Sequence, residues 1–349
     1  EYAYVNPETD AAHCCGHHAQ MAGIFGAALA LTVPEIAEKL GGQVVFFATP
    51  AEEYGEIEFK NQLREQGKIR YGGGKCELIR TGAFDDIDLC LAHHIQPGDE
   101  IQVGSGTGNG FVSKVIRYLG KAAHAAGAPD KGVNALSAAS LGLQALGLNR
   151  ETFRDEDCVR VHPIITKGGN LVNVIPDEIV IETLVRAKTI EAFTDAAKKT
   201  DRSFQAGAVA MGAKVEITTL PGYLPTLAEE ALPELKRAAE LSAPETNVIE
   251  ASGHTGGSTD VGDVQHLMPV YTFNTGGVKG GLHQVEFEVT DEEEAYIVTA
   301  KMFALGAYGL LKEKAARSRE LVKNYKPVFE NSAKYAEFMD QFDSKEVLE

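Results

Sequence analysis

The sequence predicts an α/β protein in which a main α/β domain is interrupted by a smaller, ferredoxin-like α+β domain. Three observations predict this fold class. Continuous apolar runs at 43–48 and 88–92 are typical of buried strands in a parallel or mixed sheet. Between about 111 and 220 the order becomes strand, helix, strand, strand, helix, strand, which is the split βαβ arrangement. After Pro221 and Pro225 the α/β pattern of the first part resumes, so we expect the chain to return to the main domain.

The first part should alternate helix and strand. Small residues between 20 and 31 would let a helix lie close to a sheet, and Pro34 then breaks or restarts that helix. The runs 43–48 and 88–92 are the two predicted strands of this part.

The middle part supplies the inserted domain. Its predicted elements are a strand at 111–119, a helix at 133–146, strands at 159–166 and 178–187, a helix at 190–211 and a strand at 214–220. We therefore predict three segments: 1–107 and 222–349 for the main domain, and 108–221 for the inserted domain. The glycine-rich stretch 104–110 is interpreted as a hinge between them.

The last part should contain a strand at 270–273 and a long amphipathic helix at 292–311. Residues beyond about 315 are highly charged and helical in pattern, so we expect a solvated tail helix there.

Composition excludes several classes of partner. The chain has 33 Lys and Arg against 50 Asp and Glu, a net charge of −17, which argues against a nucleic-acid partner. No apolar stretch approaches the roughly 18 residues of a membrane span, and no charged-then-apolar stretch opens the sequence, so we expect neither a membrane span nor a secretory signal. Five scattered cysteines do not make a disulfide scaffold, so we expect a cytoplasmic protein.

The densest group of potential metal ligands lies at 13–18, His-Cys-Cys-Gly-His-His. Thiolate and imidazole suit zinc and similar ions, and Gly16 permits the tight turn that such convergence needs. The alternative interpretation is a reactive, metal-free pair of cysteines.

Three further groups follow predicted strands or lie in loops. Glu52 and Glu53 come after the run 43–48, where one carboxylate could hold a cation while the other takes a proton from water. His93 and His94 follow the run 88–92, and His283 lies in a glycine-rich loop. Each group alone is more often structural, but together they indicate a metal site.

These motifs resemble, in order, those of the aminoacylase-type family of metal-dependent peptidases and amidohydrolases. The resemblance runs from about residue 13 to 310, in the branch of aminobenzoyl-glutamate, hippurate and N-acyl amino acid hydrolases. The motifs that carry it are 13–20, 50–53, His-Ile-Gln-Pro at 94–97, Gly-Lys-Ala-Ala-His-Ala-Ala-Gly at 120–127, Val-Asn-Val-Ile-Pro-Asp-Glu at 172–178, and Gly-Leu-His at 281–283.

The resemblance implies a zinc-peptidase-like mixed sheet and two divalent metal ions, zinc or manganese, in the main domain. Its metal ligands match Cys15, His17, Glu53, His94 and His283, and its general base matches Glu52. With metals bound, such a site would activate water to cleave the amide bond of an N-acyl amino acid, an aminobenzoyl-glutamate-like compound or a small peptide.

The inserted domain resembles the family's lid, which also forms homodimers. His124 matches the histidine that commonly completes the partner subunit's site in this family, and Asn173 and Arg186 match positions that hold the polar end of the substrate. Two positions depart from the pattern: His18 replaces an acidic or amide residue, and Gln20 replaces a histidine found in many members.

Members normally carry a further segment before the Cys-Gly-His motif, and a core that lacked it could be incomplete and inactive. Two alternative functions therefore stay open. One is a metal-binding but catalytically silent relative that acts as a dimeric ligand-binding protein, and the other is thiol chemistry at Cys14 and Cys15. The stretch 104–110 lacks the glycine spacing of a nucleotide-binding loop.

Overall fold

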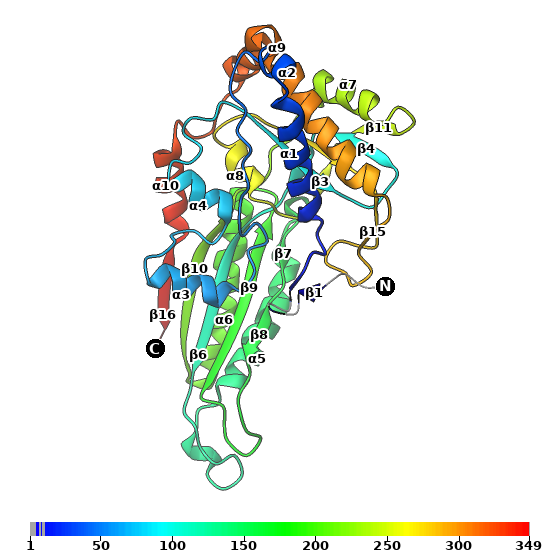
Figure 1. Cartoon of the computed structure of the whole chain (residues 1–349). Helices are drawn as coiled ribbons and strands as arrows, with labels where there is room; N and C mark the ends of the chain where they lie inside the picture. The colour runs from blue at the N-terminus through cyan, green and yellow to red at the C-terminus, as the bar shows by residue number, and fades with distance from the viewer. Residues whose placement is uncertain (1–4, 7, 9–10, 349) are drawn as a thin grey trace.

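In the computed structural model of the chain, residues 5–6, 8 and 11–348 are described. The outermost residues of the predicted first and last segments, 1–4 and 349, therefore lie outside the described part. Figure 1 shows a mixed α/β part at the top of the view and a long antiparallel sheet below it. The division at 107 and 221 stays a prediction.

The main part is built on a four-stranded mixed sheet, as predicted. The strand order is β11-β4-β13-β3, in which β11/β4 and β13/β3 are parallel pairs and β13/β4 is antiparallel. Two of these strands precede the antiparallel part and two follow it, so the chain leaves this sheet and returns to it. The strands are β3 (Cys90–Ile95), β4 (Glu100–Val103), β11 (Asn247–Glu250) and β13 (Val270–Thr275).

Helices α1 (His17–Leu31), α7 (Pro233–Ser242) and α9 (Thr299–Asn324) pack on this sheet, and α1 lies directly against α9. The small residues of α1 make this approach possible: a Cβ on Gly23 would lie 2.5 Å from Cγ2 of Thr299. The helix predicted to restart at Pro34 is present as α2 (Pro34–Ala37), with proline at its first position. The predicted helix 292–311 is also present, as a π-helical turn (Glu293–Val298) that continues into α9.

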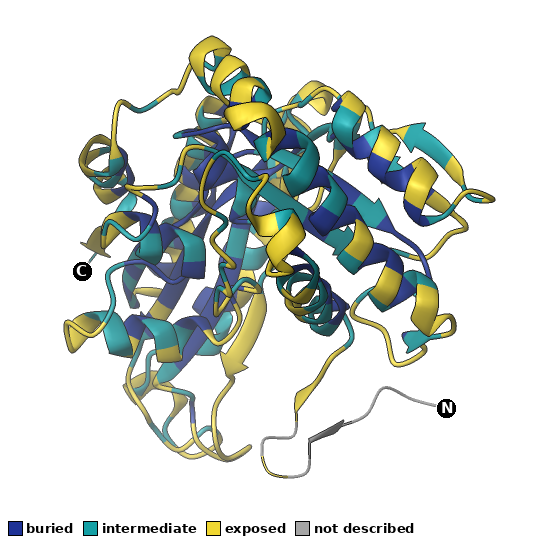
Figure 2. Cartoon of the chain, turned by 45° about the horizontal axis from the view of Figure 1, so that its top comes forward, coloured by how far each residue is buried: buried dark blue, intermediate teal, exposed yellow. Residues whose placement is uncertain are grey.

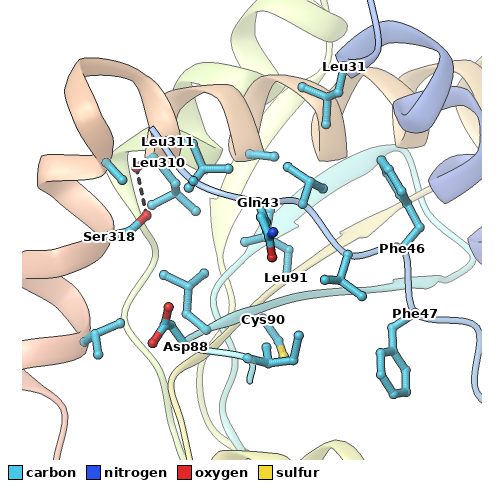
Figure 3. Close-up of a pocket in the computed structure, with 18 of the residues that line it drawn as sticks. Leu31, Gln43, Phe46, Phe47, Asp88, Cys90, Leu91, Leu310, Leu311 and Ser318 are labelled. Carbon is cyan, nitrogen blue, oxygen red and sulfur yellow. Dashed lines mark hydrogen bonds between the residues drawn. The ribbon is translucent and has the colours of Figure 1, made fainter. Parts of the chain in front are cut away.

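The strand predicted at 43–48 is not formed. This run has no regular structure, and Val45 is 52% exposed. A cavity of about 680 Å³, lined by residues 41–47 on one side and 86–91 on the other, separates it from β3 (Figure 3). Among the described strands, only β13 pairs with β3. The prediction was wrong because an apolar run forms a strand only where a neighbour completes the ladder.

The strand predicted at 88–92 is shifted by two to three residues and is β3. Its histidines were expected to follow the strand, but both His93 and His94 lie within it.

The antiparallel sheet contains all the elements predicted for the inserted domain. Its order is β16-β10-β6-β9-β7, with β8 also paired to β9, and α5 and α6 cover one face. The helices approach closely because a Cβ on Gly207 would lie 2.2 Å from the Ala138 carbonyl oxygen. The elements are β6 (Gly110–Leu119), α5 (Ala135–Asn149), β7 (Arg160–Val161), β8 (Ile164–Lys167), β9 (Glu178–Ala187), α6 (Ile190–Met211), β10 (Lys214–Tyr223) and β16 (Ser344–Leu348).

The expectation of a solvated tail is wrong. Helix α10 (Ser332–Met339) buries Tyr335 and Met339, and the Tyr335 hydroxyl donates a 2.8 Å hydrogen bond to Asp263. The last strand, β16, then pairs with β10 at the edge of the antiparallel sheet. Buried aromatic residues among the charges hold the tail against both parts of the molecule.

Buried residues concentrate in the two sheets and on the inner faces of the helices, whereas outer helix faces are exposed (Figure 2). No helix in the described part of the chain combines the length and apolar character of a membrane span. The remaining elements are β1 (Val5–Asn6), β2 (Ala11–Ala12), α3 (Ile57–Glu65), α4 (Gly74–Arg80), β5 (Thr107–Gly108), β12 (His254–Thr255), α8 (Val261–Gln265), β14 (Val278–Lys279), β15 (Glu288–Val289) and short 3₁₀ turns at 129–131, 150–152, 155–157 and 340–342.

Candidate metal centre

Cys15 and His17 are placed by the turn that starts α1. Gly16 caps this helix in the left-handed region (φ +82°), and a Cβ there would lie 2.0 Å from Cγ2 of Ile95. Glycine therefore lets the turn lie against the end of β3. As a result, Cys15 Sγ lies 3.5 Å from Nε2 of His94.

His93 and His94 project to opposite faces of β3, because side chains alternate along a strand. His93 is buried, and its Nε2 lies 2.8 Å from the Thr275 hydroxyl and 3.3 Å from that of Thr299. His94 faces Cys15 instead, and its Nδ1 lies 2.6 Å from the Ile95 carbonyl oxygen. That contact orients the ring and leaves Nε2 for a ligand role.

Glu52 and Glu53 lie in a loop beside His17. The His17 Nε2 atom is 3.7 Å from Oε2 of Glu52 and 3.6 Å from Oε1 of Glu53. The Tyr223 hydroxyl donates a hydrogen bond to the backbone carbonyl of Glu52. Ala51, with φ of +57°, takes a left-handed conformation that is unfavourable for a side chain and typical of constrained functional loops.

His283 completes the cluster from the opposite side of Glu53. Its Nε2 lies 3.5 Å from the second carboxylate oxygen of Glu53, and its backbone N–H donates to the Cys14 carbonyl at 2.7 Å. His283 also has a positive φ, +62°. Glu53 therefore lies between His17 and His283, with one oxygen toward each.

The predicted metal ligands, together with the predicted base Glu52, form overlapping groups of three. Within each group the ligand atoms lie within 4.8 Å of one another. The groups are Cys15, His17 and His94; Cys15, Glu53 and His283; and His17, Glu52 and Glu53. One sulfur, imidazole nitrogens and carboxylate oxygens make a donor set that zinc accepts, and Cys15, His17 and Glu53 each belong to two of the groups.

The electrostatics of the cluster favour a bound cation. Burial, reinforced by the charge of Glu53, raises the pKa of Cys15 to about 12. Burial lowers the pKa of His17, which keeps its imidazole neutral and able to bind a metal. A divalent cation would offset the burial and the carboxylate repulsion, and would hold the sulfur as a thiolate.

Arg186 lies on the same side of the antiparallel sheet as Tyr223. Its guanidinium is 5.7 Å from the centre of the Phe111 ring, and the Phe111 and Tyr223 rings are 4.7 Å apart. Burial lowers the pKa of Arg186. Two aromatic rings thus separate Arg186 from the Glu52 loop.

His124 and Asn173 lie elsewhere. The backbone N–H of Ala125 donates to the Asn173 carbonyl at 2.9 Å, and Nδ1 of His124 accepts from the N–H of Gly127 at 3.0 Å. Both residues lie beyond the far end of β6, a ten-residue strand about 33 Å long. In a single chain the structure therefore does not bring them to the carboxylates.

A family model for "Peptidase family M20/M25/M40" matches residues 3–307. The chain belongs to this peptidase family. The resemblance predicted from the motifs is thus confirmed, and the fold and the hydrolase class with it.

Relatives of the M20 chain include the mouse Xaa-Arg dipeptidase, 28% identical over 330 residues, which cover 90% of this chain and 67% of the relative. One of the subunits of the p-aminobenzoyl-glutamate hydrolase from Escherichia coli is 30% identical over 176 residues, covering 50% of this chain and 32% of that one. The chain spans about two thirds of the length of the mouse and human dipeptidases, 67% and 66%.

A solved structure, a dinuclear metal-binding peptidase of the M20 family from Bacillus subtilis, superposes with a TM-score of 0.57 at 23% identity. The match covers 89% of this chain and 78% of that one, and it shows a shared fold. Dinuclear metal binding is thus named for an M20 member of the same fold.

The two positions that depart from the M20 pattern have no ligand role in the described cluster. The Gln20 amide donates a hydrogen bond to the His93 carbonyl and so fastens α1 to β3. The His18 ring lies beside that of His13, with centroids 5.4 Å apart and the ring planes tilted by 53°. Sequence reasoning missed Tyr223, because nothing in the strand pattern of β10 distinguishes a tyrosine that contacts the Glu52 loop.

Proposed function

We propose that this M20-family chain is a metal-dependent amidohydrolase that cleaves the amide bond of N-acyl amino acids, aminobenzoyl-glutamate-like compounds or small peptides. The observation that carries the proposal is the convergence of four separate chain segments on one cluster of ligand atoms. Cys15, His17, Glu53, His94 and His283 are the proposed ligands. Relatives named as a dipeptidase and an aminobenzoyl-glutamate hydrolase support the reaction class.

Two divalent ions, zinc or manganese, are the proposed cofactors. When bound, such a pair polarises the substrate carbonyl and lowers the pKa of water. The contribution of this chain is to hold five donors on a helix start, a strand and two loops, with Glu53 between two imidazoles. The sulfur ligand favours zinc, whereas the imidazoles and carboxylate accept either ion.

Glu52 is the proposed general base. The Glu52 carboxylate lies at the border of the cluster, 3.7 Å from His17, and contacts one imidazole where Glu53 contacts two. The Tyr223 hydroxyl holds the backbone of Glu52 by a hydrogen bond to its carbonyl. From this position Glu52 can take the proton of the attacking water and deliver it to the leaving nitrogen. The loop geometry keeps the carboxylate aimed at the cluster.

Arg186 is the proposed anchor for the substrate carboxylate, because an arginine fork binds a carboxylate through two parallel hydrogen bonds. It has lost part of its hydration by burial. A carboxylate would replace that lost hydration.

We further propose that His124 and Asn173 act in the site of a second copy, in a homodimer formed through the lid, 108–221. The separation of these residues from Glu52 within one chain supports this arrangement. His124 would donate a hydrogen bond to the developing oxyanion. The glycine-rich connector 104–110 would let the lid close.

We also propose a cytoplasmic location, because the five free cysteines fit a reducing compartment.

The test is an activity screen on the full chain, reconstituted with zinc or manganese. We expect release of free amino acid from at least one of N-acetyl amino acids, aminobenzoyl-glutamate or dipeptides, and complete loss of that release with a chelator. A chain that binds two metal equivalents yet hydrolyses none of these compounds would contradict the proposal and favour the catalytically silent relative.

A further inference from the structure

The loop that carries Glu52 holds a backbone conformation that its own sequence disfavours. Ala51, Tyr54 and Glu56 have positive φ values of +57°, +52° and +52°. This region is unfavourable for residues other than glycine, and it persists only where the surrounding structure holds it. Part of that support comes from Tyr54, whose hydroxyl donates a 2.6 Å hydrogen bond to the Pro221 carbonyl. The rest must come from other contacts of the loop.

The start of helix α4 is a surface against which this loop rests. A Cβ on Gly74 would lie 1.7 Å from the carbonyl oxygen of Pro50, two residues before Glu52. A Cβ on Gly73 would lie 2.2 Å from Cε1 of Tyr223, the residue whose hydroxyl holds the Glu52 carbonyl. Only glycine permits so close an approach. Any shift at the start of α4 would therefore displace both contacts that border the loop.

Lys75 and Asp260 fasten the start of α4 to the interior of the main part. Asp260 is fully buried, and one of its carboxylate oxygens accepts from the backbone N–H of Lys75 at 2.9 Å. The other oxygen accepts from Nζ of Lys75 at 2.5 Å, and the lysine side chain is only 18% exposed. Asp260 lies directly before α8, where Asp263 accepts hydrogen bonds from the Leu224 backbone and the Tyr335 hydroxyl. The ion pair is thus anchored in a fixed, buried region.

The Lys75–Asp260 pair has no part in the proposed mechanism, although it lies close to the base. Burial raises the pKa of Asp260; the ammonium of Lys75 opposes this effect, and the negative charge of Glu52 adds to it. A buried ion pair gives little stability beyond that of apolar residues of similar volume. A role for this pair is therefore better sought in what it holds in place.

We propose that Lys75 and Asp260 are positioning residues for Glu52. Their ion pair fixes the start of α4, and the start of α4 in turn holds the strained loop from which the Glu52 carboxylate projects. This inference rests on the proposed function, in which Glu52 is the general base. It goes further by naming the residues on which the placement of that base depends.

The first experiment examines the loop in the metal-free chain, so that it needs no turnover. A glutamate-specific protease cuts a loosened loop after Glu52, Glu53 or Glu56, and mass spectrometry of the fragments gives the rate at these bonds. We expect Lys75→Met to raise this rate about tenfold, because proteolysis follows the population of the open loop. Lys75→Arg, which keeps the charge, should stay within about twofold of the wild-type rate.

A second variant separates a loosened loop from a destabilised chain. Lys75→Met leaves the Asp260 carboxylate buried without a cation, so the double variant Lys75→Met/Asp260→Asn is measured beside it. Asparagine keeps an acceptor for the backbone N–H of residue 75 and removes the buried charge. We expect the double variant to unfold at nearly the wild-type temperature, while its loop is still cleaved faster than that of the wild type.

The matched control is Arg80→Met. Arg80 also forms an ion pair from α4, with Glu77 at 2.5 Å, but it lies at the other end of the helix. Its substitution should leave cleavage of the loop unchanged. Cleavage at the wild-type rate in the double variant would overturn the inference.

The second experiment measures kinetics of the zinc-loaded chain on the substrate that the activity screen identifies. The double variant should lower kcat about tenfold and leave KM within about twofold, because a displaced base weakens only the chemical step. Faster cleavage of the loop with an unchanged kcat would overturn the inference. Faster cleavage in the variants of a chain whose wild type hydrolyses no substrate would support the positioning of Glu52 while contradicting the proposed function.

Discussion

Two groups of residues that the motifs single out end up in very different surroundings. The metal-centre cluster gathers atoms from four chain segments, with Cys15 3.5 Å from His94 and His283 3.5 Å from Glu53. His124, by contrast, lies with Asn173 beyond the distal end of the antiparallel sheet. The difference in position fits our proposal that one chain carries the water-activating half of a site and that a second copy supplies the rest.

The largest expected effect is that of Glu52→Gln. Removing the proposed base should lower kcat by about 10³-fold, because proton transfer by a positioned side chain contributes roughly 10²–10⁴-fold. Metal content should stay at the wild-type value, since Glu52 is not a proposed ligand. Steady-state kinetics together with metal analysis check this prediction, and a variant as active as wild type would remove Glu52 from its role.

His124→Ala tests the distal half of the comparison. We expect a fall in kcat of about 10²–10³-fold from loss of an oxyanion donor. The decisive measurement mixes this variant with Glu52→Gln. In a mixed dimer, one site would combine an intact Glu52 with the partner's intact histidine, so activity should reappear.

Recovery should approach a quarter of wild-type activity after subunit exchange, because half of randomly mixed dimers would be hybrids with one functional site each. If the two inactive variants stay inactive when mixed and a dimer is present, the site is not shared between copies.

His93 and His94, which are neighbours on β3, should differ in what they contribute: one to metal binding and the other to stability. His94→Ala should lower metal content below two equivalents with little loss of stability. His93→Ala should keep the metal but cost about 2–3 kcal/mol, because it leaves a cavity in the core and removes the hydrogen bonds of His93 to the Thr275 and Thr299 hydroxyls. Metal analysis and urea unfolding distinguish the two, and the reverse outcome would exchange their roles.

The smallest expected effect concerns Glu229, whose backbone pairs with Ser105 where the chain returns from the antiparallel part. Burial raises the pKa of Glu229 to about 7. The pKa of Glu229 in the folded state lies above its pKa in the unfolded state. The contribution of Glu229 to the free energy of unfolding is therefore fully present below about pH 4 and is lost as the pH rises through 7. Glu229→Gln should therefore raise the free energy of unfolding by about 1–3 kcal/mol at pH 8 and leave it unchanged near pH 4. Urea unfolding at both pH values measures the difference; an equal effect at both would exclude titration as the cause.

Much of the fold could be predicted from the sequence because its signals are local. The antiparallel part was predicted element by element, since each strand and helix there carries its own periodicity and its neighbours follow in the chain. The run 43–48 has the same apolar character, but a strand also needs a partner, and none of the described strands lies beside it. The buried contacts of Tyr335 were hidden by the charges around it, because composition cannot show which face of a helix packs.

The candidate site was predictable to the extent that motifs name residue types. The Cys-Gly-His turn and the Glu-Glu pair indicated ligands that the structure brings together. What a sequence does not give is distance: it could not show that His124 lies a strand length from Glu52, or that Tyr223 contacts the Glu52 loop. The pairing of Lys75 with Asp260 likewise depends on tertiary packing, because the two residues lie 185 positions apart in the chain.

The central claim is that Cys15, His17, Glu53, His94 and His283 hold two divalent ions. Its most direct test is the metal content per chain, measured by plasma mass spectrometry on wild type and Glu53→Gln purified without chelator. We predict about two equivalents of zinc or manganese in wild type and one or fewer in the variant, since Glu53 contacts both His17 and His283. A wild-type value near zero after reconstitution, or an unchanged value in the variant, would contradict the account.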